Sequence, residues 1–435
     1  MRIGIILLLL VAVLATPPVS AADFRDSDRD HAYTMLRDVR LEIEQKYFDP
    51  ALKGIDMAAN AEVAKTRIAK AASIGETFAA IAQFVLELDD SHTFFVPPWQ
   101  TTVVDYGWAM EMIGETCYVV RVKPGSDAAR QGVTRGDVVK TVNGFRPTRE
   151  TSWRLEYLFR ILRPQPGLHV ELATSRSGAR ELDLAAEVRQ RKKVVALTGA
   201  DSGWDIARMN DERAKESREQ QPVAVEVSKQ VLVVRLPTFA IDESAIRQVL
   251  HRAHGYETLI LDLRGNRGGA VTALQTLLGG LSATDISIGS LKERERTTPL
   301  LAKGVGKDAV AGRVFVLVDA ESASASELFA RAVQLVERGT VIGDRTAGAV
   351  MTARYNPLLV SHGENVIVYG ALVTTADVIM YDGGRLEKKG VTPDFIVLPT
   401  AEDLAAGRDP ALAQALKFAG QSLDATAAGA LLPKE

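Results

Sequence analysis

The chain begins with segments whose apolar residues repeat at helical spacing. The positions that recur every three or four residues are Leu36, Val39, Ile43, Tyr47, Phe78, Ile81, Phe84 and Leu88. This spacing places apolar side chains on one face of a helix. The pattern is broken at residues 89–92, and Pro97 and Pro98 mark the end of the segment, because proline punctuates helical segments. We therefore expect a small helical cap over residues 22–100.

Residues 101–190 instead show short apolar runs separated by turns. Pro124 and Gly125 indicate a turn, and Asn143 with Gly144 indicates a tight hairpin. A short helix is expected over 127–131. Cys117 lies in an alternating strand pattern and is expected to be a small buried hydrophobe rather than a nucleophile. The pattern predicts a small β-rich module.

Apolar strand-like runs alternate with helical segments over residues 223–400. Expected strands cover 231–236, 259–263, 314–318, 341–342 and 366–369, and expected helices cover 270–280 and 325–337. Near-continuous apolar strands that alternate with helices predict a mainly parallel sheet covered by helices. A charged linker over 191–222 is expected before this α/β core, and a C-terminal helix and tail over 401–435 after it.

The first residues have the pattern of an export signal. Arg2 supplies a short basic region, an apolar run covers 3–15, and Val19, Ser20 and Ala21 form a small-residue cleavage site. We expect a signal peptide over 1–21 and an exported, periplasmic or extracellular protein. Contact with a membrane is expected only if this segment is retained, because no later segment has the ~18 consecutive apolar residues that spanning needs.

Composition excludes several classes of function. The net charge of −3 gives no electrostatic basis for binding nucleic acid. Cysteine and histidine do not cluster at zinc spacing, so no metal is expected. The Gly268–Gly269 pair is not followed by the Lys-Ser/Thr of a phosphate loop, so no nucleotide cofactor is expected either.

Candidate chemistry gathers where the predicted core strands end, because ligands in such sheets bind at the carboxyl ends of strands. Ser324 lies at a strand-to-helix turn, where the helix dipole and free amides stabilise an oxyanion. The alternative is structural, since Ser324 and Glu327 also have the spacing of a capping box. Gly268 and Gly269 let the backbone approach a ligand, or they merely bound a turn into a helix.

Three segments together resemble the catalytic core of the C-terminal processing (tail-specific) serine peptidases: 261–269, 322–327 and 343–349. The resemblance implies that Ser324 is the nucleophile. It also implies an oxyanion hole from an amide of Gly268 or Gly269 and the amide of Ala325.

Residues 119–144 resemble part of a bacterial PDZ domain. PDZ domains add an extended peptide to a sheet edge and bind its terminal carboxylate with backbone amides. The resemblance implies a carboxylate-binding loop formed by Gly107, Trp108, Ala109 and Met110. Such a module would recognise substrate C-termini or gate the active site.

One residue departs from the family pattern. The processing peptidases place a general-base lysine 25 positions after the serine, where this chain has Ala349. A serine hydroxyl needs a base, so the histidines are the next candidates. Ser91 and His92 resemble the Ser-His pair of tricorn-type proteases, which implies that His92 is the base, supported by Ser91 and Glu387.

Alternatives to this catalytic site remain open. His92 could be structural, and Glu387 could belong to a surface hairpin. Lys388, Lys389 and His362 are rival bases. The sequence favours an exported serine endopeptidase acting on proteins or peptides. The competing hypothesis is a catalytically degenerate peptide-binding scaffold, and a retinoid-type carrier on a related core is disfavoured because the Ser324 motif is intact.

Overall fold

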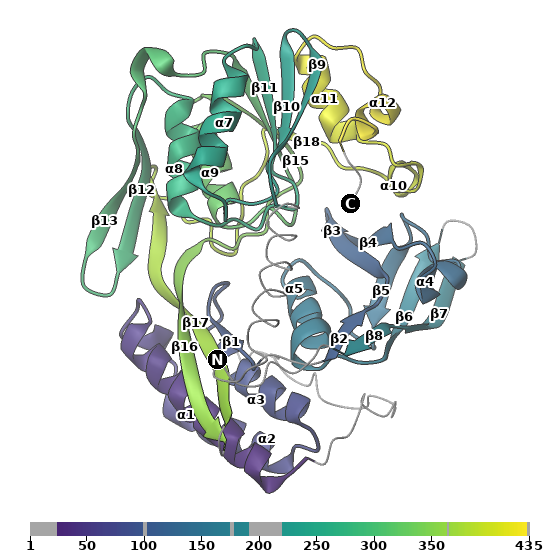
Figure 1. Cartoon of the computed structure of the whole chain (residues 1–435), viewed down its shortest axis with the longest axis vertical. Coiled ribbons are helices and arrows are strands. Elements are labelled where there is room, and N and C mark those ends of the chain that lie inside the picture. The colour runs from purple at the N-terminus through teal and green to yellow at the C-terminus, as the bar shows by residue number, and fades with distance from the viewer. Residues whose placement is uncertain (1–23, 99–101, 175–177, 191–219, 363–364, 433–435) are drawn as a thin grey trace, which may run out of the picture.

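The computed structural model describes residues 24–98, 102–174, 178–190, 220–362 and 365–432. The expected signal peptide and most of the expected charged linker lie outside these residues. Within them, no helix has the length and apolar character needed to cross a membrane. Figure 1 shows helices at the N-terminal end, a β-rich module beside them, and an α/β core above both.

Residues 24–98 form a helical layer in which each helix buries its apolar stripe. Its helices are α1 (Asp26–Lys46), η1 (Leu52–Gly54), α2 (Met57–Lys70) and α3 (Ile74–Leu86). The Asp56 side chain caps α2 by accepting from the amides of residues 58 and 59, and the Ser73 hydroxyl caps α3. The buried cluster includes Leu36, Ile43, Ile81 and Leu88.

The β-rich module is an antiparallel sheet in the order β3-β4-β5-β6-β7, beside the pair β2-β8. Its elements are β2 (Thr102–Asp105), β3 (Trp108–Ile113), β4 (Thr116–Val122), α4 (Asp127–Arg130), β5 (Val138–Val142), α5 (Ser152–Glu156), η2 (Tyr157–Leu162), β6 (Gly167–Thr174), β7 (Gly178–Ala185) and β8 (Glu187–Gln190). Asn143 and Gly144 have φ of 49° and 79°, as a tight turn requires.

The core contains a six-stranded sheet in the order β18-β15-β14-β11-β10-β9. Its strands are β9 (Val223–Ser228), β10 (Val231–Arg235), β11 (Thr258–Asp262), β14 (Arg313–Val318), β15 (Gly339–Gly343) and β18 (Phe395–Ile396). Every pairing is parallel except β9 with β10. The predicted helix-covered, mainly parallel sheet is therefore confirmed.

Helices cover both faces of this sheet. One face packs against α7 (Glu243–Ala253), α8 (Val271–Gly280) and α9 (Ala325–Leu335). The other packs against α11 (Pro410–Phe418) and α12 (Ala425–Gly429), which follow α10 (Ala401–Ala406). Alternate residues of a strand face opposite layers, so the central strands are apolar along their whole length. The C-terminal region is thus several short helices rather than one helix and a tail.

A second, antiparallel sheet was not expected from the sequence. It orders β1-β17-β12-β13, with β16 also paired to β17. Its strands are β1 (Phe94–Val96), β12 (Ile286–Glu293), β13 (Thr297–Ala302), β16 (Met351–His362) and β17 (Asn365–Met380), and η3 (Gly306–Asp308) follows β13. The strand predicted at 366–369 belongs to this sheet, because β16 and β17 form a direct hairpin and no helix intervenes.

The β16–β17 hairpin reaches from the core to the N-terminal helices (Figure 1). Tyr369, Ala371 and Val373 of β17 are buried in the same cluster as the helices α1, α2 and α3. Strand β1, which directly follows the helical layer, pairs with β17 from Phe94 to Val96. Residues 91–93 are therefore held at a fixed position relative to the core.

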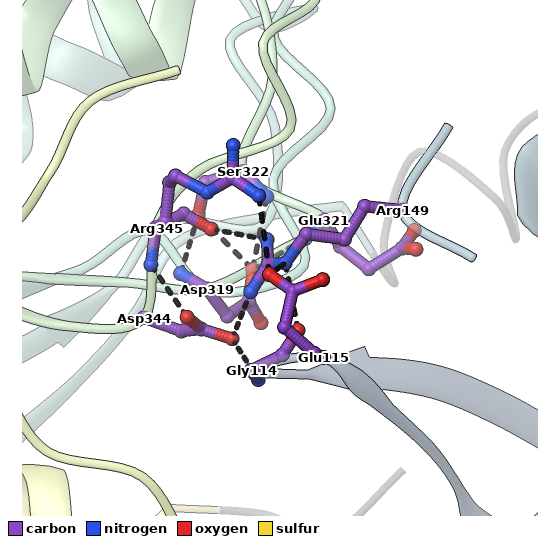
Figure 2. Close-up of polar contacts among 8 residues, drawn as sticks. All are labelled: Gly114, Glu115, Arg149, Asp319, Glu321, Ser322, Asp344 and Arg345. Atoms are coloured by element: carbon purple, nitrogen blue, oxygen red, sulfur yellow. Dashed lines mark hydrogen bonds and ion pairs between the residues drawn. The ribbon is translucent and has the colours of Figure 1, made fainter. Parts of the chain in front are cut away.

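A buried polar junction joins the β-rich module to the core (Figure 2). The Arg149 guanidinium donates to Asp344 Oδ2 at 2.5 Å, to the Gly114 carbonyl at 2.7 Å and to the Arg345 carbonyl at 2.9 Å. The Gly114 amide donates to the same Asp344 oxygen at 2.7 Å. The Arg149 and Asp344 side chains are 8% and 10% exposed, so water screens this pair little.

Arg149→Gln is expected to destabilise this junction strongly. Removing one partner of a buried ion pair leaves the other charge uncompensated, at a cost of about 3–5 kcal/mol. Urea unfolding followed by the fluorescence of Trp108 and Trp153, which lie in the module, measures the loss. The matched control is Arg296→Gln, whose own side chain is exposed and whose partner Glu293 is partly exposed, and which should cost less than about 1 kcal/mol. Equal effects would contradict the assignment.

Candidate active site

Ser324 lies between strand β14 and helix α9, immediately before the first helical residue. Its φ of 56° and ψ of −116° are unusual for a residue with a side chain, and such conformations cluster at functional sites. The Ser324 amide donates to the Ala349 carbonyl at 2.9 Å and to Glu327 Oε2 at 3.1 Å. The serine is thus held in a strained turn at the N-terminal end of an 11-residue helix.

The two neighbouring serines have structural partners. The Ser322 hydroxyl donates to the Leu263 carbonyl, and the Ser326 hydroxyl donates to the Asn266 carbonyl, both at 2.8 Å. Both residues are fully buried, whereas Ser324 is partly exposed. Of these three hydroxyls, the one on Ser324 is therefore accessible to a substrate.

The loop before Ser324 is braced at its base by Asp319. Asp319 Oδ1 accepts from the amides of Glu321 and Ser322, at 3.0 Å and 2.9 Å. Figure 2 shows this loop directly beside the module–core junction. The turn that carries Ser324 is therefore held from both sides.

The backbone of Gly268 approaches Ser324 more closely than a side chain would allow. A Cβ on Gly268 would lie 2.7 Å from the Ser324 Cβ and 3.0 Å from the Ala325 nitrogen. Gly268 and Gly269 have φ of 95° and 142°, which also favours glycine. The glycine pair and the first amide of α9 therefore lie on the same side of the nucleophile candidate.

The two glycine amides are not equivalent. The Gly268 amide donates to the buried Asn266 Oδ1 at 2.8 Å, so it already has a partner. The Gly268 carbonyl accepts from Phe239, and in a trans peptide the following N–H points the opposite way. The Gly269 amide therefore points away from Phe239. The Gly269 amide and the Ala325 amide, which has no intrahelical partner at this position, are therefore the candidates for an oxyanion hole.

Position 349 lies directly beside Ser324, as the hydrogen bond from the Ser324 amide to its carbonyl requires. The backbone of a lysine at this position would therefore lie next to Ser324. Ala349 provides no titratable group, so a base must come from another segment.

A hydrogen-bonded chain links His92, Ser91 and Glu387. His92 Nδ1 lies 2.7 Å from Ser91 Oγ, which donates to Glu387 Oε2 at 2.7 Å. The Ser91 amide donates to Glu387 Oε1 at 2.9 Å, and the Val350 amide donates to Glu387 Oε2 at 2.8 Å. Val350 follows Ala349, so this chain is anchored to the loop that contacts Ser324.

This arrangement determines which imidazole nitrogen is available. The single hydroxyl proton of Ser91 is directed to the Glu387 carboxylate, so Ser91 Oγ accepts from His92 Nδ1–H. The other ring nitrogen, Nε2, is then the proton acceptor.

Burial affects the pKa of both ends of this chain. Desolvation lowers the pKa of His92 below its ordinary value, with Asp90 opposing the shift, and it raises the pKa of Glu387. A lowered pKa keeps the His92 imidazole neutral at neutral pH. The ring is then in the form that a general base needs.

The rival bases are poorly placed. Lys388 forms an ion pair with Asp89, and Lys389 is exposed. His362 ends β16, eleven residues along the strand from Met351, which corresponds to about 35 Å of extended chain. The Lys388 amide does donate to the Gly348 carbonyl of the loop beside Ser324, but the ammonium group of Lys388 is paired with Asp89. The His92 ring, in contrast, is linked to the same loop through Ser91 and Glu387.

The predicted carboxylate-binding loop has a different structure from the one expected. The Gly107 amide donates to Asp105 Oδ1 at 2.8 Å, so an acidic side chain already occupies it. Trp108, Ala109 and Met110 lie in β3, paired with β4. They line a cavity of about 30 Å³ between β3 and the α5–η2 helix, with room for only a few water molecules.

Two residues of the site were not predicted from the sequence. Arg160 of η2 lines the β3–α5 cavity. Glu327 was considered only as a capping residue, yet its carboxylate is buried beneath Ser324. Its spacing from Ser324 is the signal that could have drawn attention to it. In the described part of the chain, no group of His, Cys, Asp and Glu side chains could hold a metal ion.

Residues 230–397 match the profile of peptidase family S41. Among curated relatives, the chain is 27% identical over 279 residues to the tail-specific protease of Haemophilus influenzae, covering 63% of this chain and 36% of that protein. It is 26% identical over 357 residues to the chloroplastic C-terminal processing peptidase of Tetradesmus obliquus, covering 75% and 69%. It is 30% identical over 179 residues to tricorn protease homolog 1 of Streptomyces coelicolor, covering 40% and 15%. The chain thus spans about a third of the Haemophilus protein's length.

Solved structures share the fold across most of the chain. Mature CPAF complexed with lactacystin superposes with a TM-score of 0.63 at 14% identity, covering 87% of this chain and 96% of that one. The photosystem II D1 C-terminal processing protease superposes with a TM-score of 0.52 at 20% identity, covering 92% and 99%. The motifs, the matched profile and the relatives agree: residues 230–397 form a peptidase family S41 domain, and the chain is similar to the C-terminal processing serine peptidases.

Proposed function

We propose that this chain is a serine endopeptidase in which Ser324 is the nucleophile and His92 is the general base. The observation that carries the proposal is the Glu387–Ser91–His92 chain, fastened through Val350 to the loop beside Ser324. It supplies an oriented imidazole to a site from which the family's lysine is missing.

The proposed reaction follows from this geometry. His92 Nε2 takes the Ser324 hydroxyl proton as Oγ attacks the scissile carbonyl carbon. The carbonyl oxygen becomes an oxyanion, bound by the amides of Gly269 and Ala325. The tetrahedral intermediate breaks the C–N bond, and His92 returns the proton to the departing amine. Water, deprotonated by His92, then hydrolyses the acyl-enzyme and regenerates the Ser324 hydroxyl.

Glu387 and Ser91 act as positioning residues in this mechanism. The Glu387 carboxylate directs the Ser91 hydroxyl, and that hydroxyl fixes the His92 tautomer. The negative charge of Glu387 also stabilises the imidazolium that forms during attack.

The substrates are proposed to be proteins or peptides outside the cytoplasm, in accordance with the expected signal peptide. The β-rich module, which resembles a PDZ domain, would bind a C-terminal segment between β3 and α5. Arg160 is the cation in this groove, stacked over Tyr106, and it would bind the terminal carboxylate in place of the occupied Gly107 amide. Because the cavity is small, α5 would have to move away from β3.

Ser324→Ala is expected to abolish peptide hydrolysis while the fold persists, because loss of a helix cap costs only about 1 kcal/mol. Hydrolysis of a fluorogenic peptide library and the thermal midpoint are the measurements. Ser326→Ala is the matched control and should retain turnover, since its hydroxyl bonds only to a backbone carbonyl. Full activity of Ser324→Ala would show that Ser324 is a capping residue and not the nucleophile. A folded wild-type protein without turnover would favour a binding scaffold.

His92→Ala is expected to be nearly as inactive as Ser324→Ala, and the double variant should lose little more, because nucleophile and base act as one unit. In the wild type, kcat/KM should fall as pH decreases through a midpoint below 6.5, since the protonated ring cannot accept a proton and burial lowers the pKa of His92. If the pH profile of kcat/KM shows no group that titrates in this range, and His92→Ala remains active, His92 is not the general base.

Peptides that end in a free apolar carboxyl terminus are expected to bind more tightly than their amidated forms. The difference should disappear in Arg160→Gln, because the guanidinium is the proposed partner of the carboxylate. Calorimetry on the Ser324→Ala variant measures binding without cleavage. Equal affinities of the two peptide forms for the unmodified groove would contradict C-terminal recognition.

A further inference from the structure

Glu327 is a carboxylate with no counter-charge in a closed part of the core. It lies in the first turn of α9 and is fully buried. None of the ion pairs among the described residues includes it. Burying a carboxylate is costly unless hydrogen bonds compensate, so the residue needs a strong local reason to be there.

Four donors converge on the Glu327 carboxylate. Oε1 accepts from the Thr346 hydroxyl at 2.6 Å and from the Gly348 amide at 2.8 Å. Oε2 accepts from the Ala349 amide at 2.9 Å and from the Ser324 amide at 3.1 Å. Desolvation nevertheless raises the pKa of Glu327 to about 7, against the lowering effect of these donors.

These donors come from the two segments that must be aligned for catalysis. One is the nucleophile itself, through its backbone amide. The others belong to the 346–350 loop, whose Ala349 carbonyl accepts from Ser324 and whose Val350 amide donates to Glu387. Glu327 thus lies at the point where the Ser324 turn and the support of the Glu387–Ser91–His92 chain meet.

We propose that Glu327 is a positioning residue for this reaction, which fixes the 346–350 loop so that Ser324 and the His92 chain keep their relative placement. The inference rests on the proposed function, and it assigns Glu327 a role beyond capping α9. A capping role alone requires only the bond to the Ser324 amide. The three bonds to the loop have no part in ending a helix.

Replacing the carboxylate by an amide has a predictable consequence. A glutamine side chain has one acceptor oxygen, so its NH2 group must face one of the two donor pairs. If it faces Ser324 and Ala349, two backbone amides lose their acceptor. If it faces Thr346, the hydroxyl can rotate and accept, but the Gly348 amide still loses its partner. At least one bond to the loop is lost in either orientation.

The experiment compares Glu327→Gln with the wild type and with Glu337→Gln. Glu337 lies exposed just beyond the other end of α9, so its variant is the matched control and should be unchanged. For Glu327→Gln, kcat should fall about 10- to 100-fold while KM stays within about twofold, because small misplacements affect the reacting atoms rather than substrate binding. The labelling rate of Ser324 by a fluorophosphonate should fall in parallel.

A double variant separates positioning from a general loss of stability. If Glu327 acts through the loop that holds Glu387, Glu327→Gln combined with Glu387→Gln should lose much less than the product of the two single losses. Multiplicative losses would overturn the inference. So would a wild-type kcat in Glu327→Gln.

Hydrogen exchange of the loop gives a measurement that does not require activity. The amides of Gly348 and Ala349 should exchange faster in Glu327→Gln and not in Glu337→Gln. If the wild type has no turnover, the proposed function fails, yet this measurement still decides whether Glu327 holds the loop. If Glu327→Gln does not fold, Glu327→Asp, whose carboxylate is about 1.5 Å short of the loop, should show the same changes. Unchanged exchange in the folded variant would contradict the inference.

Discussion

The site depends on the Glu387 carboxylate, which joins two segments that are far apart in the sequence. It accepts from Ser91, at the end of the helical layer, and from Val350, beside the nucleophile turn. The pairing of β1 with β17 also holds the segment of Ser91 on the core, and Glu387 adds the contact that reaches the loop beside Ser324. A serine hydroxyl is a weak nucleophile without a base, so in the proposed mechanism this contact determines whether Ser324 can react.

The architecture serves this contact. The parallel sheet presents Ser324 and the Gly268–Gly269 loop at the carboxyl ends of its strands, as open α/β sheets generally do. The antiparallel sheet connects the core to the helical layer that carries His92. Its strand β17 packs on the N-terminal helices and pairs with β1, which follows His92 in the chain. In the proposed mechanism, a base from this layer takes the place of the lysine that is absent at position 349. Catalysis would then depend on how firmly the layer and the core are held together.

Sequence reasoning was most effective where function requires a particular residue type in a local pattern. The parallel core followed from its apolar strands. Ser324 and the glycine pair, proposed from motifs, lie beside each other, and His92 and Glu387, proposed from resemblance to tricorn-type proteases, are linked through Ser91; their catalytic roles stay predictions. The antiparallel sheet could not be predicted, because the pairing of β17 with β1 and β12 depends on long-range contacts that leave no local pattern. The sequence also did not predict that the amides of Gly107 and Gly268 donate hydrogen bonds to side chains two residues earlier in the chain.

Glu327 shows a different limit. Its sequence position indicates a cap, and the structure contains that contact. Its bonds to residues 346–349 arise only because the strand after α9 returns the chain to the same end of the sheet. A single side chain thus satisfies both a local and a long-range requirement.

The central claim is that His92 is the base, and an NMR titration of its ring tests this most directly. The midpoint for His92 in the wild type should lie below 6.5 and should coincide with the acidic limb of kcat/KM, which reports the pKa of the free enzyme's base. A His92 midpoint above 6.5, or one that differs from the kinetic midpoint by more than about one pH unit, would contradict the account.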